Sequence, residues 1–297
     1  MLNFKKLTLQ DMPWARDILY NSGNFGCEYT FGGAIVWSSY FDSFTARFED
    51  FIIYRCIRTD HAGYSYPCGK GDIKKAFEEI FADAKALGKP PMIFGMTHEL
   101  TGQLDSLFPD RFEFSPNENS LDYIYKTNDL AQLPGKKYHA KRNHVSAFLR
   151  SHQNWGFEII GRENIDECIE MLECWYKENA GKANIEDEKK ALFHGLSIYF
   201  EVGFSGGILR SDGQIIALTF GEPINDRIFD IHFEKALDIN GAYAMINQQF
   251  AKNCLGAYEY INREEDLGIE GLRKAKLSYR PAILLEKFHA MTKSELS

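Results

Sequence analysis

Helix and strand signals alternate along this chain of 297 residues, and a similar order of signals occurs in each half. The first half has an early helix and apolar segment, a strand and its hairpin partner, an amphipathic helix, a strand, a helix and a strand. They are expected over residues 11–20, 29–41, 48–57, 62–67, 73–84, 92–96, 97–107 and 121–125. Strands interleaved with helices exclude all-helical and all-β folds. The alternation therefore predicts an α/β (α+β) protein.

The second half repeats this order around a three-stranded meander. Its expected elements are a strand, two helices, the meander, a helix, a strand, a short helix and a last strand. They are expected over residues 157–160, 165–178, 187–201, 206–209, 214–222, 227–234, 242–254, 259–262, 269–277 and 281–288.

The length of the chain indicates how many domains it forms. At about 150 residues per domain, 297 residues fit two domains. The pattern breaks at Pro134-Gly135. We therefore expect two tandem domains, residues 1–130 and 131–297, each with a mixed sheet flanked by helices.

Composition and charge argue against a membrane-spanning chain and against a protein that binds nucleic acid extensively. The hydrophobic share is 44%, and no uninterrupted apolar run reaches the roughly 20 residues of a membrane helix. The net charge of −8 opposes extensive nucleic-acid contact, which depends on neutralising phosphates. The six cysteines include no C-x-x-C pair, and the N-terminus lacks the apolar core of a secretory signal. These features predict a cytoplasmic protein with reduced thiols, and they leave the oligomeric state open.

The segment 260–281 carries the densest polar pattern. A strand end leads into a turn with Asn262, Arg263 and Asp266, and a short helix then carries Arg273 and Lys276. The last two are three residues apart, so they share a helix face and could bind one phosphate or carboxylate. An internal ion-pair network would explain the same pattern.

A second cluster, residues 135–150, has five Lys or Arg, two His and no acid. Its Lys141, Arg142 and Asn143 could form a positive wall for an anionic ligand. His139 and His144 are five residues apart, which is poor spacing for zinc on a helix, and no third ligand is evident. The sequence predicts no metal site.

The strand at 227–234 offers candidate general bases. Asp230, His232 and Glu234 alternate along it, so they are expected to share one face of the sheet. Acyl transfer to an amine or hydroxyl needs a proton acceptor and oxyanion stabilisation but no protein nucleophile. No G-x-S-x-G signature is found that would supply one.

The order of elements resembles the acyltransferase fold of the GNAT superfamily. The run Asn262-Arg-Glu-x-Asp266-Leu-Gly-x-x-Gly-Leu-Arg273-x-x-Lys276-Leu-Ser-Tyr-x-Pro281, with Lys141-Arg142-Asn143 upstream, resembles the C-terminal domain of bacterial phosphatidylglycerol lysyltransferases. The resemblance covers nearly the whole chain. It implies two tandem GNAT-like domains akin to Fem-type aminoacyltransferases, with transfer of an aminoacyl group from aminoacyl-tRNA to an acceptor.

The same resemblance places Asn262, Arg263, Asp266, Arg273 and Lys276 at the family's polar site. The membrane-spanning half of the lysyltransferases has no counterpart in these residues, so the lipid acceptor does not carry over as an expectation. The leading hypothesis is a soluble aminoacyl- or acyltransferase.

The leading hypothesis assigns roles to the two polar clusters. Arg273 and Lys276 would hold an anionic donor or acceptor group beside Lys141 and Arg142, with limited contact to tRNA. The proton acceptor would be Asp266, Glu234 or His232, and the pattern does not choose among them.

Two alternatives remain open at this level. The first is an acetyl-CoA-dependent N-acetyltransferase, because Gly69 and Gly71 keep the glycine spacing of a pyrophosphate-binding turn before a helix. Tyr66 stands where that turn has a polar residue, so the match is half complete. The second alternative is a non-catalytic anion-binding module that retains the fold.

Overall fold

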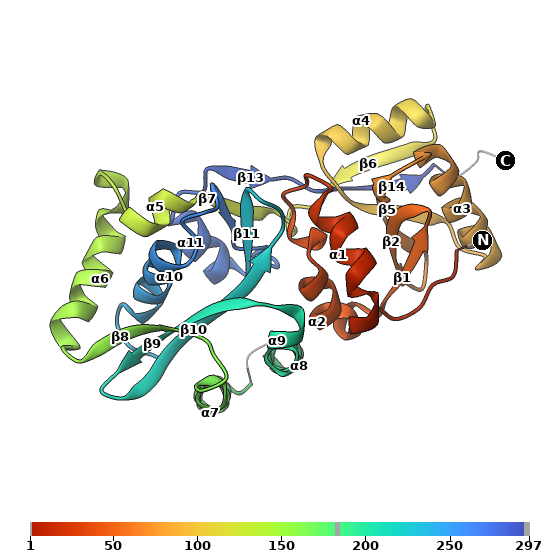
Figure 1. Ribbon diagram of the computed structural model, residues 1–297. Coiled ribbons are helices and arrows are strands. Elements are labelled where there is room, and N and C mark those ends of the chain that lie inside the picture. Colours follow the sequence, from red (N-terminus) through yellow and green to blue (C-terminus); the bar gives the residue numbers. More distant parts are fainter. Residues whose placement is uncertain (1, 182–184, 294–297) are drawn as a thin grey trace. The chain divides into compact units, whose positions relative to one another are not determined.

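The computed structural model describes residues 2–181 and 185–293, which form two compact units (Figure 1). Unit 1 comprises Met1–Asp122, Glu265–Ile269 and Leu284–Ser297, and unit 2 comprises Tyr123–Glu264 and Glu270–Ile283. Each unit is built on one mixed seven-stranded sheet with helices packed on it. This architecture confirms the predicted fold class.

Unit 1 holds a sheet with strand order β1-β2-β3-β5-β14-β6, and β4 also pairs with β2. Its strands are β1 (Ser43–Phe48), β2 (Asp50–Ile57), β3 (Ala62–Ser65), β4 (Cys68–Lys70), β5 (Pro91–Met96), β6 (Phe112–Pro116) and β14 (Phe288–Thr292). Its helices are α1 (Met12–Tyr20), α2 (Phe31–Phe41), α3 (Ile73–Ala86) and α4 (His98–Leu107). As predicted, β2 and β3 form an antiparallel hairpin.

Helix α3 shows why these sequences fold as they do. Asp72 precedes it, and its side chain accepts a hydrogen bond from the backbone N–H of Lys75, which caps the helix. Phe77 and Ile80 recur at helical spacing and are completely buried in the core of the unit. The amphipathic helix expected from the sequence is therefore present and packs against the sheet.

Unit 2 is built on a sheet with strand order β13-β7-β12-β11-β10-β9-β8. Its strands are β7 (Asp122–Lys126), β8 (Trp155–Ile159), β9 (Ser205–Ser211), β10 (Gln214–Pro223), β11 (Ile228–Ala236), β12 (Tyr260–Asn262) and β13 (Ile283–Leu285). Its helices are α5 (Thr127–Gln132), α6 (His139–Ser151), α7 (Ile165–Glu178), α8 (Ile185–Ser197), α9 (Tyr199–Val202), α10 (Ala242–Asn253) and α11 (Glu270–Leu277). Helix α10 covers one face of the sheet, and α7 and α8 lie on the other (Figure 1).

The pairing of β10 with β11 shifts register in the middle of the sheet. Phe220 pairs with Phe233 and Gly221 pairs with Ile231, so His232 is an extra residue on β11. Such a bulge breaks the alternation of side chains between the two faces. A Cβ at Gly221 would lie 1.8 Å from the carbonyl oxygen of Asp230, so only glycine fits at this point.

The bulge corrects the expectation that Asp230, His232 and Glu234 share one face. Glu234 is bonded by Asn247 of α10, whereas the next residue, Lys235, pairs with Glu188 of α8 on the opposite side. Asp230 and His232 lie on the α8 side with Phe233, because the extra residue shifts the phase of the strand beyond it. The predicted common face is therefore wrong for Glu234.

The bounds of the units differ from the expected 1–130 and 131–297. The chain after residue 283 does not end in the second unit: β14 returns to the sheet of unit 1 and lies between β5 and β6. Strand β7, expected in the first domain, pairs with β12 in the sheet of unit 2. Within the described residues, each helix is too short or too polar to cross a membrane.

We expect Gly221→Ala to lower the free energy of unfolding by about 1–3 kcal/mol, because the new methyl group would collide with the backbone at Asp230. Urea unfolding followed by circular dichroism measures this. Gly271→Ala on α11 is the control, because a Cβ there meets no atom within 4 Å and stability should not fall. Equal midpoints for the two variants would contradict the packing argument.

Candidate active site

Glu234 of β11 is the centre of a polar cluster beneath helix α10. Its side chain is 9% exposed, and its Oε1 accepts a hydrogen bond of 2.8 Å from Nη2 of Arg263, which follows β12. Its Oε2 accepts a hydrogen bond of 3.2 Å from Nδ2 of Asn247. A guanidinium and an amide thus fix both carboxylate oxygens. We call Thr219, Glu234, Asn247 and Arg263 the Glu234 cluster.

Three atoms of this cluster are buried without a hydrogen-bond partner among the described residues. They are Oγ1 of Thr219, Oδ1 of Asn247 and Nη1 of Arg263. Thr219 lies opposite Glu234 in the pairing of β10 with β11, and both Thr219 and Asn247 are at most 1% exposed. Buried polar groups without partners are rare because each costs about 1–3 kcal/mol. The cluster can therefore offer a donor, an acceptor and a hydroxyl to a ligand.

Two aromatic rings and a second cation border the Glu234 cluster. Arg263 Cζ lies 5.0 Å from the ring centre of Tyr279 and 5.8 Å from that of Tyr125. Lys141 Nζ lies 3.8 Å above the ring of Tyr279. Burial and the positive charge of Arg263 lower the pKa of Lys141 to about 8, although Glu234 opposes this shift. Lys141 therefore lies beside the predicted site residue Arg263, in an electropositive setting.

His232 lies on the other face of the sheet, among three carboxylates. Its Nδ1 is 2.8 Å from Oε1 of Glu264 and 3.5 Å from Oδ2 of Asp230, and its Nε2 is 3.1 Å from Oε1 of Glu222. Burial by itself lowers the pKa of this imidazole, but the bonds to Glu222 and Glu264 and the charge of Asp230 outweigh it and raise the pKa well above its usual value. We call these four residues the His232 cluster.

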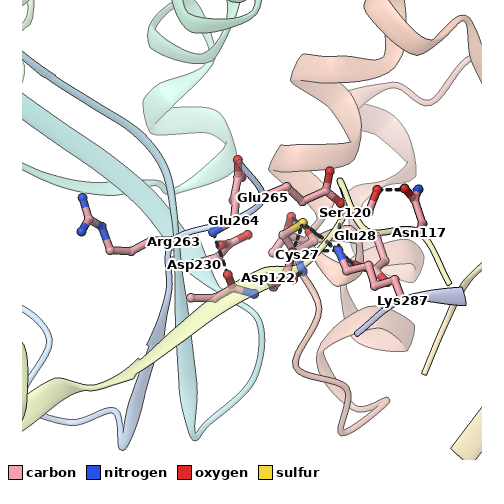
Figure 2. A network of polar contacts seen from close by, with 12 residues as sticks. Cys27, Glu28, Asn117, Ser120, Asp122, Asp230, Arg263, Glu264, Glu265 and Lys287 are labelled. Atoms are coloured by element: carbon pink, nitrogen blue, oxygen red, sulfur yellow. Dashed lines mark hydrogen bonds and ion pairs between the residues drawn. The ribbon is translucent and has the colours of Figure 1, made fainter. Parts of the chain in front are cut away.

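The two clusters are separate. The guanidinium of Arg263 points away from the carboxylates of Asp230 and Glu264 (Figure 2). The bulge causes this separation, since it directs Glu234 and His232 to opposite faces. The sequence suggested one row of candidate bases where the structure has two different environments.

Other predicted site residues contact the main chain. Lys276 donates to the carbonyl oxygen of Arg263 and, at 3.0 Å, to that of Glu264, so it supports the loop that follows β12. Arg142 donates to the carbonyls of Leu133, at 2.5 Å, and Gly135, at 2.6 Å. Both cations therefore have a role in holding backbone segments of unit 2.

The other predicted site residues of segments 260–281 and 135–150 are either bonded to the main chain or lie on helix surfaces. Asn262 is buried, and its Oδ1 accepts the N–H of Glu264 at 2.7 Å. Asp266 is 1% exposed, and its Oδ1 accepts the N–H of Gly268 at 2.8 Å within the loop of unit 1. Arg273 is half-buried on α11, and Asn143 is exposed on α6.

The glycines proposed for pyrophosphate binding have a packing explanation. Gly69 lies in β4, where a Cβ would come within 1.9 Å of the carbonyl oxygen of Asp50 on β2, and a Cβ at Gly71 would meet the ring of Phe51 at 2.9 Å. The carboxylate of Asp72 already caps the helix that follows. This negative charge stands at the end where a phosphate would bind.

Sequence reasoning missed a buried cluster in unit 1. Lys287 Nζ lies 2.8 Å from Glu28 Oε2, 2.8 Å from Asp122 Oδ1 and 3.1 Å from Glu265 Oε1, and it donates to Cys27 Sγ at 3.4 Å (Figure 2). Burial raises the pKa of Glu28 and Glu265, although Lys287 opposes the shift. These residues are far apart in the sequence, and no local pattern connects them.

Thr219 and Asn247 were also missed. Asn247 had a detectable signal, because it is a polar residue on the apolar face of the expected helix 242–254, between Ile246 and Phe250. Thr219 had none, because threonine is common in buried strands.

The sequence matches the family described as phosphatidylglycerol lysyltransferase, C-terminal, over residues 21–291. The chain belongs to this family. It also matches a protein of Mycoplasmoides gallisepticum at 23% identity over 176 residues, which are 58% of this chain and 56% of that protein, so the chain spans about half the length of this relative. The family assignment confirms the resemblance seen in the closing motif.

Solved structures show the same fold. A conserved protein from Bacteroides thetaiotaomicron superposes with a TM-score of 0.94 at 38% identity, covering 99% of this chain and 100% of that chain. L-PGS from Bacillus licheniformis has a TM-score of 0.64 at 17% identity, with 94% and 91% covered. FemX has a TM-score of 0.60 at 9% identity, with 97% and 96% covered. The last two likenesses show the fold alone.

We expect Lys141 to titrate with a pKa of about 8, well below the usual value of about 10.4 for lysine, because burial and Arg263 disfavour its charged form. The pH dependence of its labelling by an amine-reactive reagent, followed by mass spectrometry, measures this pKa. Arg263→Gln should raise the pKa and Glu234→Gln should lower it further. Labelling of Lys141 only above pH 10 would contradict this environment.

Proposed function

We propose that this chain is an aminoacyltransferase that moves the aminoacyl group of an aminoacyl-tRNA to an amine or hydroxyl acceptor. Membership of the lysyltransferase C-terminal family and the fold shared with FemX support transfer chemistry. The observation that carries the proposal is the set of three unpartnered polar atoms around Glu234.

These three atoms complement an aminoacyl ester. The ester has a carbonyl oxygen, which accepts hydrogen bonds, and an α-ammonium group, which donates them. Nη1 of Arg263 can donate to the carbonyl oxygen, and Oδ1 of Asn247 can accept from the ammonium group. Arg263 would then stabilise the oxyanion that develops when the acceptor attacks the carbonyl carbon.

We choose Glu234 as the proton acceptor from the three candidates Asp266, Glu234 and His232. Its carboxylate is bonded by Arg263 and Asn247, and it lies opposite Thr219 in the sheet, so it contacts or pairs with each residue that carries an unpartnered atom. Both ring nitrogens of His232, by contrast, already face carboxylates. Asp266 is buried in its own turn, where its carboxylate accepts a backbone N–H. In the proposed step the acceptor loses its proton to Glu234 while its N or O atom bonds to the carbonyl carbon. The ester C–O bond then breaks, and the tRNA oxygen takes a proton.

Lys141 and the exposed basic residues on α6 and in the turn before it favour an anionic donor near this site. Lys136, Lys137 and Arg150 are exposed on or beside α6, although Lys137 also pairs with Asp129. Their local field would attract a phosphate backbone despite the net charge of −8. We therefore propose a limited contact with the acceptor end of tRNA.

The test supplies purified protein with tRNA charged with labelled amino acids, and with a lipid and small-molecule extract as the source of acceptors. We expect the wild type to transfer label, and Glu234→Gln to lower the rate about 10²–10⁴-fold because the proton acceptor is lost. Arg263→Lys should lower it about 10²–10³-fold through loss of the oxyanion donor. Glu259→Gln is the matched control, because this carboxylate pairs with Arg227 at the surface.

A parallel reaction with acetyl-CoA in place of charged tRNA tests the acetyltransferase alternative. Release of free CoA without transfer of amino acid would replace our proposal by that alternative. No turnover with either donor would overturn the transferase proposal in favour of a binding module. Full activity in Glu234→Gln would remove Glu234 from the mechanism.

A further inference from the structure

We propose that the His232 cluster binds one divalent transition-metal ion. Asp230, His232 and Glu264 would be its ligands, and Glu222 would orient the histidine. This inference does not depend on the proposed transferase reaction, because the cluster lies on the opposite face of the sheet from Glu234.

The arrangement of the ligand atoms fits one ion. The candidate atoms of Asp230, His232 and Glu264 all lie within 4.8 Å of one another, and both carboxylates lie on the Nδ1 side of the ring. Metal bonds of about 2.0–2.2 Å to nitrogen and oxygen place neighbouring ligands roughly 3 Å apart. A small movement of these side chains around an ion would therefore complete the site.

Metal-binding histidines usually donate a hydrogen bond from the ring nitrogen that does not bind the ion, and Glu222 is placed to accept this bond from His232. Its Oε1 lies 3.1 Å from Nε2 of His232, on the opposite side of the ring from Asp230 and Glu264. A carboxylate that accepts the Nε2 proton leaves the lone pair of Nδ1 directed toward the other two carboxylates. This carboxylate–histidine–metal order is the usual way to fix the tautomer and orientation of a ligating imidazole.

The charge of the cluster also favours a cation. Three carboxylates surround one imidazole, so the formal charge stays at −2 even when the ring is protonated. Asp230 and the side chain of His232 are completely buried, where concentrated negative charge is costly. A divalent ion in place of the ring proton would reduce this charge. The side chain of Glu264 is 21% exposed and lies where an ion could enter.

The donor set indicates the class of ion. One imidazole with two carboxylates suits Zn²⁺, Mn²⁺ or Fe²⁺, whereas Mg²⁺ prefers oxygen ligands and retains its water. Three protein ligands leave further coordination positions to water. The ion would connect strand β11 to the loop after β12, just beyond the last pair of these strands, Asp230 with Asn262.

The test titrates the full chain, freed of metal with EDTA, with Zn²⁺ against a chromophoric indicator, and separately with Co²⁺ by absorption spectroscopy. We expect one Zn²⁺ per chain, bound at least 100-fold more tightly than Mg²⁺. Asp230→Asn should abolish this binding, and Glu222→Gln should weaken it about 10–100-fold through loss of the outer hydrogen bond. The Co²⁺ spectrum should lack a thiolate charge-transfer band, because no ligand is cysteine.

Glu28→Gln is the matched control, because Cys27, Glu28 and Asp122 are the other group of candidate ligands among the described residues. The affinity of Glu28→Gln for Zn²⁺ should equal that of the wild type.

If circular dichroism shows that Asp230→Asn is unfolded, Glu264→Gln replaces it, since that side chain is partly exposed. No saturable binding, equal affinity for Mg²⁺, or binding unchanged in the ligand variants would overturn the proposal. None of these readouts measures transfer, so this inference and the proposed function can fail independently.

Discussion

The close approach of Gly221 to the backbone of Asp230 is the constraint on which the arrangement of the polar clusters in unit 2 depends. The approach allows an extra residue, His232, in the middle of β11. Because side chains alternate with period two, one extra residue reverses the faces of everything beyond it. Glu234 thereby meets Asn247 under α10, and His232 meets the carboxylates on the other face. One register shift produces two chemically different polar environments from one short strand.

The protein buries many charges, and it does so in separate groups. Arg263 pairs with Glu234, His232 lies among three carboxylates, and Lys287 lies among three others in unit 1. A buried charge is tolerated where an opposite charge and hydrogen bonds compensate its desolvation. The Glu234 cluster differs from the Lys287 cluster because three of its polar atoms have no partner among the described residues. This difference is why we place substrate binding at Glu234.

Family membership narrows the chemistry without deciding these roles. The family match spans the closing motif, yet Lys276 and Arg142 bond backbone carbonyls in unit 2. A cation of the motif can thus hold the loop that carries Arg263 through bonds to its main chain. The loop held by Lys276 contains Arg263, so the motif and the proposed site are physically connected.

The sequence by itself determined the fold class, most helices and strands, and the family. These depend on local periodicity and on one continuous motif, as the capped, amphipathic helix α3 illustrates. It also placed Arg263, Glu234 and Lys141 among the candidates. Only the tertiary structure decided which candidates meet, because the bulge, the return of β14 to unit 1 and the grouping of Lys287 with Glu28 depend on pairing between distant segments. Local spacing carries no information about such contacts, since a shift of one residue in a strand reverses the face of each side chain beyond it.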